Sequence, residues 1–230
     1  MNLAVIPARG GSKRLPRKNL RCFAGQPIIT WSIKAAFESG LFDQVIVSTD
    51  SAEIAAVARD AGAEVPFERP ADLSDDHCGT LEVMTHAARW SADHDLAPEA
   101  VCCIYATAPF VGAAALAHAR IELDSGWDYV FAAAPFAPSV HRSFIRLGTG
   151  GMKPLFPEHQ LSRSQDLPPV FHDAGQFYWG RLEAWVEARP IFGERTTFIE
   201  LPPDQVQDID TPEDWLMAER LFEKIAKARR

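Results

Sequence analysis

Two groups of residues in the sequence could do chemistry, and the first is a basic segment at residues 9–21. It contains six basic residues, two adjacent glycines, a serine and an asparagine, and it has no acidic residue. Glycines let backbone amides approach an anion closely, while lysine and arginine supply positive charge. The whole chain carries a net charge of −8. A polyphosphate pocket therefore explains this concentration of cations better than a solvated basic loop does.

The second group is a pair of carboxylates near the end of the chain, Asp208 and Asp210. Side chains two residues apart lie on the same side of an extended backbone, so both carboxylates can converge on one hard cation. We expect Mg²⁺, with Mn²⁺ as the alternative, because Mg²⁺ is usually held by one or two carboxylates together with substrate phosphates. Thr211 and Pro212 also suit the start of a helix. A helix cap would explain one aspartate but not both.

The basic segment should lie at the edge of a sheet. Residues 3–6 are typical of a buried strand that ends at Pro7, so the segment leaves the carboxyl end of a strand, where open α/β sheets bind ligands. It lacks the glycine spacing of dinucleotide-binding loops and of P-loops, which argues against an oxidoreductase. Asp50 has the position of an acidic ribose contact, but its spacing to Glu53 predicts a capping box instead.

Strand and helix signals alternate along the chain, which predicts a three-layer αβα, Rossmann-like α/β sheet. Strands are expected at residues 3–6, 44–49, 64–67, 100–105, 129–134, 176–179 and 198–201, and helices at 27–39, 51–61, 80–92, 112–123 and 212–228. With 230 residues, 47% of them hydrophobic, we expect a single domain over residues 1–230. Prolines and glycines predict a β-rich excursion at about residues 136–170, for which the alternative is a long surface loop.

Composition excludes several classes of protein. The uncharged stretch 101–117 is interrupted by Pro109 and Gly112 and is too short for a membrane span, and the first apolar run is too short for a signal peptide. We therefore expect a cytoplasmic protein. Its acidity argues against a nucleic-acid partner. The four cysteines lack metal-ligand spacing and are expected to be buried free thiols, with Cys102 and Cys103 on opposite faces of a strand.

The run IPARGGSKRLPRKNL, residues 6–20, resembles the signature of the CMP-sugar synthetases, cytidylyltransferases that activate acidic sugars. The resemblance implies that CTP transfers CMP to the anomeric hydroxyl of an acidic nine-carbon sugar and that pyrophosphate leaves. It implies catalytic roles for Arg9 and Lys18, and a metal-binding role for Asp208 and Asp210, either of which could accept the hydroxyl proton. Nucleotide contacts are implied for Ala8, Arg9, Gly10, Gly11, Ser12, Lys13, Lys18, Asn19 and Arg69.

The sugar end of the site resembles one branch of this family. Sialic acid enzymes carry Gln-Pro-Thr-Ser-Pro after the central strand, whereas this chain has Tyr105 in place of the glutamine. This change, and the residues at 163–168 and 172–179, resemble the members that act on pseudaminic acid, a diacetamido, dideoxy relative of sialic acid. Sugar contacts are then implied for Tyr105, Arg163, Gln165, His172, Asp173, Gln176 and Phe177. Arg163 would bind the sugar carboxylate with two hydrogen bonds.

Several alternatives stay open on the sequence alone. Aromatic residues such as Phe177, Tyr178 and Trp179 are more often core residues than ligand contacts, so at most Phe177 is assigned to the site. His172 and Asp173 should point to opposite faces of a strand. The sugar could instead be sialic, legionaminic or ketodeoxyoctonic acid. A non-catalytic nucleotide-binding module is a further alternative, although it would have little need of an aspartate pair. The resemblance also implies a homodimer, in which the excursion at 136–170 is the dimerisation arm.

Overall fold

A six-stranded mixed sheet forms the centre of the computed structural model, which describes residues 1–75, 77–94, 96–136 and 140–228. The strand order is β10-β6-β9-β5-β1-β4. The strands are β1 (Asn2–Pro7), β4 (Gln44–Ser48), β5 (Ala100–Ile104), β6 (Tyr129–Pro135), β9 (Phe171–Arg181) and β10 (Thr196–Glu200). Strand β9 is antiparallel to both of its neighbours, and the other pairings are parallel.

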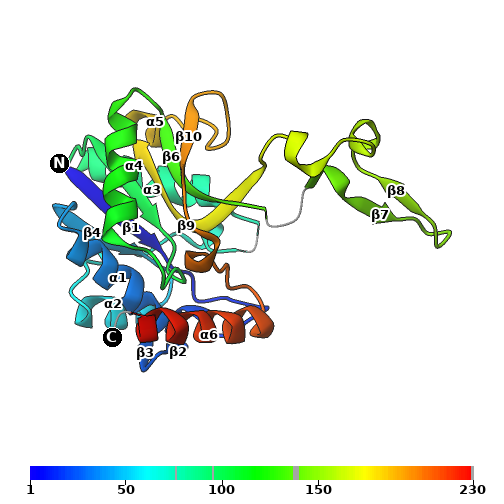
Figure 1. Cartoon of the computed structure of the whole chain (residues 1–230). Helices are drawn as coiled ribbons and strands as arrows, with labels where there is room; N and C mark the ends of the chain where they lie inside the picture. Colours follow the sequence, from blue (N-terminus) through cyan, green and yellow to red (C-terminus); the bar gives the residue numbers. More distant parts are fainter. Residues whose placement is uncertain (76, 95, 137–139, 229–230) are drawn as a thin grey trace.

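Helices cover both faces of this sheet (Figure 1). On one face lie α1 (Ile28–Ser39), α2 (Ala52–Asp60) and α4 (Ala113–Asp124), and on the other lie α3 (Thr80–Asp93) and α5 (Leu182–Val186). The last helix, α6 (Pro212–Ala228), packs on the short hairpin of β2 (Cys22–Phe23) and β3 (Gln26–Pro27). The 3-10 helices are η1 (Lys18–Leu20), η2 (Ala71–Leu73), η3 (Val140–Arg142), η4 (Pro157–His159), η5 (Ser164–Asp166) and η6 (Pro203–Gln205).

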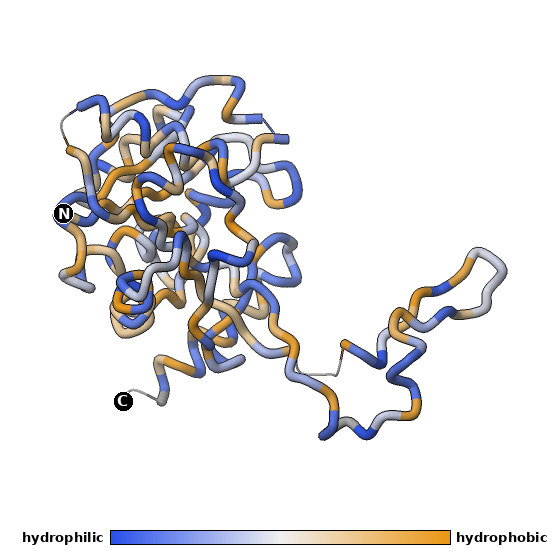
Figure 2. The backbone as a smooth tube through the Cα atoms, turned by 90° about the horizontal axis from the view of Figure 1, so that it is seen from above, coloured by the Kyte–Doolittle hydropathy of each residue, from blue (hydrophilic) through white to orange (hydrophobic). Residues whose placement is uncertain are grey.

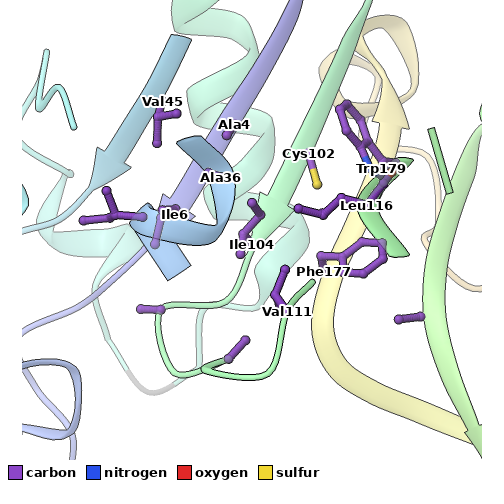
Figure 3. Close-up of a cluster of buried hydrophobic side chains, with 14 of the residues drawn as sticks. Ala4, Ile6, Ala36, Val45, Cys102, Ile104, Val111, Leu116, Phe177 and Trp179 are labelled. Carbon is purple, nitrogen blue, oxygen red and sulfur yellow. Dashed lines mark hydrogen bonds between the residues drawn. The ribbon is translucent and has the colours of Figure 1, made fainter. Parts of the chain in front are cut away.

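Alternating side chains along the strands build two cores. In β1, Ala4 and Ile6 belong to the core beneath α1 and α4, whereas Leu3 and Val5 belong to the core beneath α3. The first of these cores is drawn in Figure 3. This division confirms the predicted three-layer α/β architecture, because a period of two sends neighbouring residues to opposite faces.

The cysteines follow the same rule only in part. Cys102 and Cys103 are fully buried in different cores, as predicted for neighbours on a strand. However, Cys22 is exposed and Cys78 is partly exposed, so the expectation of four buried thiols was wrong for these two. Both lie outside the central sheet, Cys22 in the two-residue strand β2 and Cys78 in the segment before α3. Among the described residues, no helix is long and apolar enough to cross a bilayer.

Local signals at the helix ends predicted some of the observed helix termini but not others. Gly40 ends α1 with a φ of 65°, the left-handed conformation that glycine adopts without strain. The predicted capping box at Asp50 is wrong, because Ser51 caps α2 by accepting a hydrogen bond from the amide of Ile54 at 3.4 Å. Asp50 instead accepts a hydrogen bond from the amide of Gly10 at 2.8 Å and so restrains the basic segment. The short helix α5 was not predicted.

The excursion projects as an arm, and both views show it extending away from the main body of the protein (Figures 1 and 2). It carries an antiparallel hairpin of β7 (Phe144–Arg146) and β8 (Met152–Pro154). Residues 137–139, which belong to the predicted arm, lie outside the described residues. The hairpin exposes a set of apolar side chains, namely Phe144, Ile145, Leu147, Met152 and Leu155.

Candidate active site

A cavity of about 560 Å³ lies at the edge of the sheet where β1 and β5 end. Strand β9 runs antiparallel to β5, so its first residues lie at the same edge as the last residues of β5. The cavity therefore collects residues from the basic segment, the start of α3, the loop after β5, the start of β9 and the segment before α6. The sequence distance between these segments is large, and only the sheet topology brings them together.

The basic segment is fixed at several points rather than being a free loop. Leu15 is buried in the core beneath α6, and Arg17 adopts a left-handed conformation before η1. The side-chain amide of Asn19 donates to the carbonyl oxygen of Arg9 at 2.9 Å, which ties the two ends of the segment together. Arg9 also donates to the carbonyl oxygen of Asp75. The cavity is lined by cations of this segment, namely Arg9, Lys13, Arg14 and Lys18.

The predicted nucleotide contacts divide into two sets. Arg9, Ser12, Lys13, Lys18, Asn19 and Arg69 line the cavity. Ala8 is buried, and Gly10 and Gly11 are not among the described residues that line it. Arg69 is 4% exposed, and its guanidinium donates to Oγ of Ser48 at 3.1 Å as well as to the Ser48 carbonyl oxygen. Asp76, between η2 and α3, lies outside the described residues.

The aspartate pair faces the cavity because the residue between them is anchored. Ile209 is fully buried, and Asp208 and Asp210 both line the cavity wall opposite the core. Neither side chain caps α6. Instead, the Asp214 carboxylate accepts from the Thr211 amide at 2.9 Å, and the Thr211 hydroxyl accepts from the Asp214 amide at 3.2 Å. This reciprocal pair is a capping box, so both aspartates remain available for the cavity.

Cations from the basic segment reach the aspartate pair. Lys18 Nζ lies 3.2 Å from Asp210 Oδ1 and donates to the carbonyl oxygen of Ile209 at 2.8 Å. Arg14 Nη2 lies 2.9 Å from Asp210 Oδ2. Partial desolvation by the surrounding protein, and then the neighbouring Asp210 charge, raise the pKa of Asp208, while Lys18 opposes the shift. Opposite charges thus alternate along this wall, which suits both anionic phosphate and a divalent cation.

Tyr105 and Asp173 lie in the wall formed by the ends of β5 and β9. The Tyr105 hydroxyl is 2.8 Å from Oγ1 of Thr80, and burial raises the pKa of Tyr105 to about 12. Asp173 accepts hydrogen bonds from the Tyr178 hydroxyl and from the amide of Gly175, the latter at 2.9 Å. Burial also raises the pKa of Tyr178, so both tyrosines keep their protons at neutral pH.

The other five predicted sugar contacts do not line the cavity of this chain. Phe177 is fully buried in the core beside Leu116 (Figure 3), so the core alternative describes its position. Gln176 is buried too, and its amide donates to the carbonyl oxygen of Gln205 at 2.7 Å. His172 is exposed and packs on Phe136. The remaining two, Arg163 and Gln165, are exposed on the arm, where Arg163 pairs with Asp166.

Comparison with known proteins identifies the family. The family model described as Cytidylyltransferase matches residues 3–218. The chain belongs to the cytidylyltransferase family. It is 41% identical over 223 residues to the pseudaminic acid cytidylyltransferase of Campylobacter jejuni, and the match covers 96% of each chain. It is also 34% identical over 225 residues to the CMP-N,N'-diacetyllegionaminic acid synthase of Legionella pneumophila, again with 96% of each chain covered.

A solved structure supports the fold of this cytidylyltransferase. The CTP complex of CMP:2-keto-3-deoxy-manno-octonic acid synthetase matches with a TM-score of 0.71, and the match covers 97% of this chain and 98% of that one. The identity is only 15%, so the match bears on the fold alone. Together, the relatives and the family model confirm the predicted nucleotidyltransferase activity.

Sequence patterns missed three groups of this cytidylyltransferase site. Arg14 belongs to the basic segment, so its charge could have suggested the pairing with Asp210. Thr80 and Thr107 line the cavity, but isolated threonines beside helix starts and loops give no distinguishing signal. Tyr178 was assigned to the core, and its hydroxyl nevertheless contacts Asp173 behind the cavity wall.

Proposed function

We propose that this cytidylyltransferase transfers CMP from CTP to the anomeric hydroxyl of pseudaminic acid, forming CMP-pseudaminic acid and pyrophosphate. The observation that carries the proposal is the 41% identity to the Campylobacter jejuni pseudaminic acid enzyme along 96% of both chains. The identity to the legionaminic acid synthase is lower, at 34%. Tyr105 in the cavity wall adds support, since this position departs from the sialic acid pattern.

The bond changes are those of a nucleotidyl transfer. The anomeric oxygen of the sugar bonds to the α-phosphorus of CTP, the bond from that phosphorus to the bridging oxygen breaks, and pyrophosphate leaves with the electron pair. Arg9 and Lys18 line the cavity and neutralise charge on the phosphate oxygens during this step. The hydroxyl proton passes to a carboxylate oxygen of Asp208 or Asp210. Positioning and charge neutralisation supply most of the catalysis, so no side-chain nucleophile is required.

We further propose that Asp208 and Asp210 hold Mg²⁺, with Mn²⁺ as a substitute. Within the described residues, no group of three or more His, Cys, Asp or Glu side chains could hold a metal. Two carboxylates beside a wall of phosphate-binding cations nevertheless fit Mg²⁺, because this ion normally takes the rest of its ligands from water and substrate phosphates. When bound, the metal would supply positive charge to the phosphates.

A homodimer and a cytoplasmic location are part of the same proposal. The exposed apolar side chains of the β7–β8 hairpin support the arm as a dimerisation element, because an apolar patch of this kind is usually covered. The nucleotide substrate, CTP, is a metabolite of the cytoplasm, which supports the location. Light scattering of the purified protein measures its oligomeric state, and a strictly monomeric, active enzyme would contradict the homodimer.

The test of substrate and reaction is pyrophosphate release. Purified protein is mixed with CTP, Mg²⁺ and one acid at a time from pseudaminic, legionaminic, sialic and ketodeoxyoctonic acids, and each product is identified by mass. We expect turnover with pseudaminic acid at a kcat/KM at least tenfold above that for the others, since a few contacts with a sugar substituent are worth about 1–3 kcal/mol. A preference for another acid would overturn the substrate assignment but leave the proposed nucleotidyl transfer intact. CTP binding without turnover on any acid would favour the non-catalytic module.

A further inference from the structure

Asp173 occupies an unusual place in β9. The ladder between β6 and β9 shifts register between Phe131 and Ala133, and Gly175 nearby has a φ of 62°. The Asp173 carboxylate spans this irregularity, since one oxygen accepts from the Gly175 amide at 2.9 Å and the other accepts from the Tyr178 hydroxyl. Bulges of this kind re-aim side chains next to active sites. Here the irregularity directs Asp173 into the cavity.

Tyr178 lies behind the cavity wall rather than in it. Its side chain is 2% exposed, and its ring packs against Tyr105 and Phe131. Tyr178 is not among the described residues that line the cavity. Its hydroxyl nevertheless joins two residues that do, because it donates to Asp173 and lies 3.4 Å from the Tyr105 hydroxyl. A buried hydroxyl with this placement can hold both wall residues in one arrangement.

The same irregularity also contacts the aspartate pair. A side chain added at Gly175 would place its Cβ 3.4 Å from Cγ and Oδ1 of Asp208. The Asp173 charge contributes to the raised pKa of Asp208, which is consistent with their proximity. The turn that Asp173 stabilises at Gly175 therefore packs directly on one of the two proposed metal ligands.

We propose that Tyr178 is a positioning residue for sugar binding and that it acts through Asp173. This inference rests on the proposed function, and it adds a residue whose hydroxyl touches no substrate. An aspartate held by two donors is an acceptor with a fixed direction, so it suits a hydroxyl or amide N–H of the sugar. It repels the sugar carboxylate, and the sugar therefore binds with its carboxylate turned away from Asp173.

A double-mutant cycle tests this role. The variants are Tyr178→Phe, Asp173→Asn and the double variant, and the readouts are KM for the sugar acid and KM for CTP. Tyr178→Phe should raise KM for the sugar about tenfold and change KM for CTP less than twofold, because one hydrogen bond to a charged group is lost. In the Asp173→Asn background, Tyr178→Phe should change KM for the sugar less than twofold, since residues that act together are not additive.

Tyr129→Phe is the matched control. Tyr129 is equally buried, and its hydroxyl donates to the Ala184 carbonyl oxygen at 2.8 Å, away from the cavity. It should leave both KM values unchanged, and thermal melting checks that each variant folds. The proposal would be overturned if Tyr178→Phe had equal effects in both backgrounds. It would also be overturned if Tyr178→Phe left KM for the sugar unchanged or raised KM for CTP by the same factor. Absence of turnover by the wild-type protein would instead overturn the proposed function.

Discussion

Asp208 shares its cavity with two other carboxylates, Asp210 and Asp173, and both charges act on it. Desolvation and the Asp210 charge raise its pKa, so its ionised form is disfavoured relative to an isolated aspartate. A carboxylate in this place costs stability when it is ionised without a compensating cation. The arrangement is useful if a divalent cation and a phosphate bring in compensating charge, and this is what the proposed reaction requires.

We predict that Asp208→Asn lowers kcat about a hundredfold, because a charged group at the reacting phosphates is removed. The melting temperature of the protein in EDTA should not fall, since the substitution removes a repulsion rather than an attraction. Activity assays over a range of Mg²⁺ concentrations and thermal melting measure the two effects. Asp204→Asn, an exposed carboxylate in η6, is the control and should keep wild-type activity. Full activity of Asp208→Asn would contradict the metal assignment.

The residues of the site could be predicted to different extents for physical reasons. Lys18 and Asp210 belong to short segments with an unusual charge pattern, so the sequence alone predicted that they share a site, and both line the cavity. By contrast, Phe177 and Gln176 were assigned to the sugar from their place in a motif. Their side-chain directions depend on the irregularity at Gly175, which no local pattern shows. Arg163 falls within the arm predicted at 136–170, but no sequence pattern shows that this part of the arm lies outside the cavity of its own chain.

At the scale of elements, the buried carboxylate of Asp128 links three segments of the chain at one end of the sheet. Asp128, just before β6, is 3% exposed and accepts from Arg195 Nε at 2.9 Å and from Arg189 Nη1 at 3.0 Å. Arg195 precedes β10, and Arg189 follows α5. The hydrogen bonds from Arg195 are the main reason why the pKa of Asp128 is lowered, although burial opposes this shift.

The lowered pKa of Asp128 predicts a pH dependence of stability. A carboxyl group whose pKa is lower in the folded state stabilises the fold above its unfolded pKa, about 3.9, and this contribution is lost as the pH falls through the folded pKa. Asp128→Asn should therefore lower the free energy of unfolding by about 2 kcal/mol at pH 7. The difference from wild type should shrink below about pH 4.

Urea unfolding at pH 7 and at about pH 3 measures this difference. Asp124→Asn is a suitable control, because the Asp124 carboxylate, which pairs with Arg120, is itself exposed, and exposed charges contribute little to stability. It should change the free energy of unfolding by less than about 0.5 kcal/mol. If Asp128→Asn lowered the free energy of unfolding equally at both pH values, the charge of Asp128 would not be the cause.

For the whole molecule, the arm matters because of where it joins the sheet. It leaves at the end of β6, Pro135, and returns at the start of β9, Phe171, two residues before Asp173. A partner that bound the hairpin would therefore restrain the strand that carries Asp173. Two copies that bury the exposed apolar side chains of β7 and β8 against each other or against the partner's main body would restrain this strand in both subunits.

We predict that Phe144→Asp combined with Met152→Asp converts a dimer into a monomer, because both side chains are more than half exposed and charges there oppose burial. Light scattering measures the mass, and steady-state kinetics should show a KM for the sugar acid raised several-fold with KM for CTP unchanged. Ile121→Asp makes the same change at an exposed site on α4 and should preserve the dimer. A double variant that remains dimeric would exclude the hairpin as the dimer contact. A monomeric variant with wild-type KM values would support the hairpin as the dimer contact and show that dimerisation does not affect the sugar site. The position of Asp173 would then depend on Tyr178 and Gly175 alone.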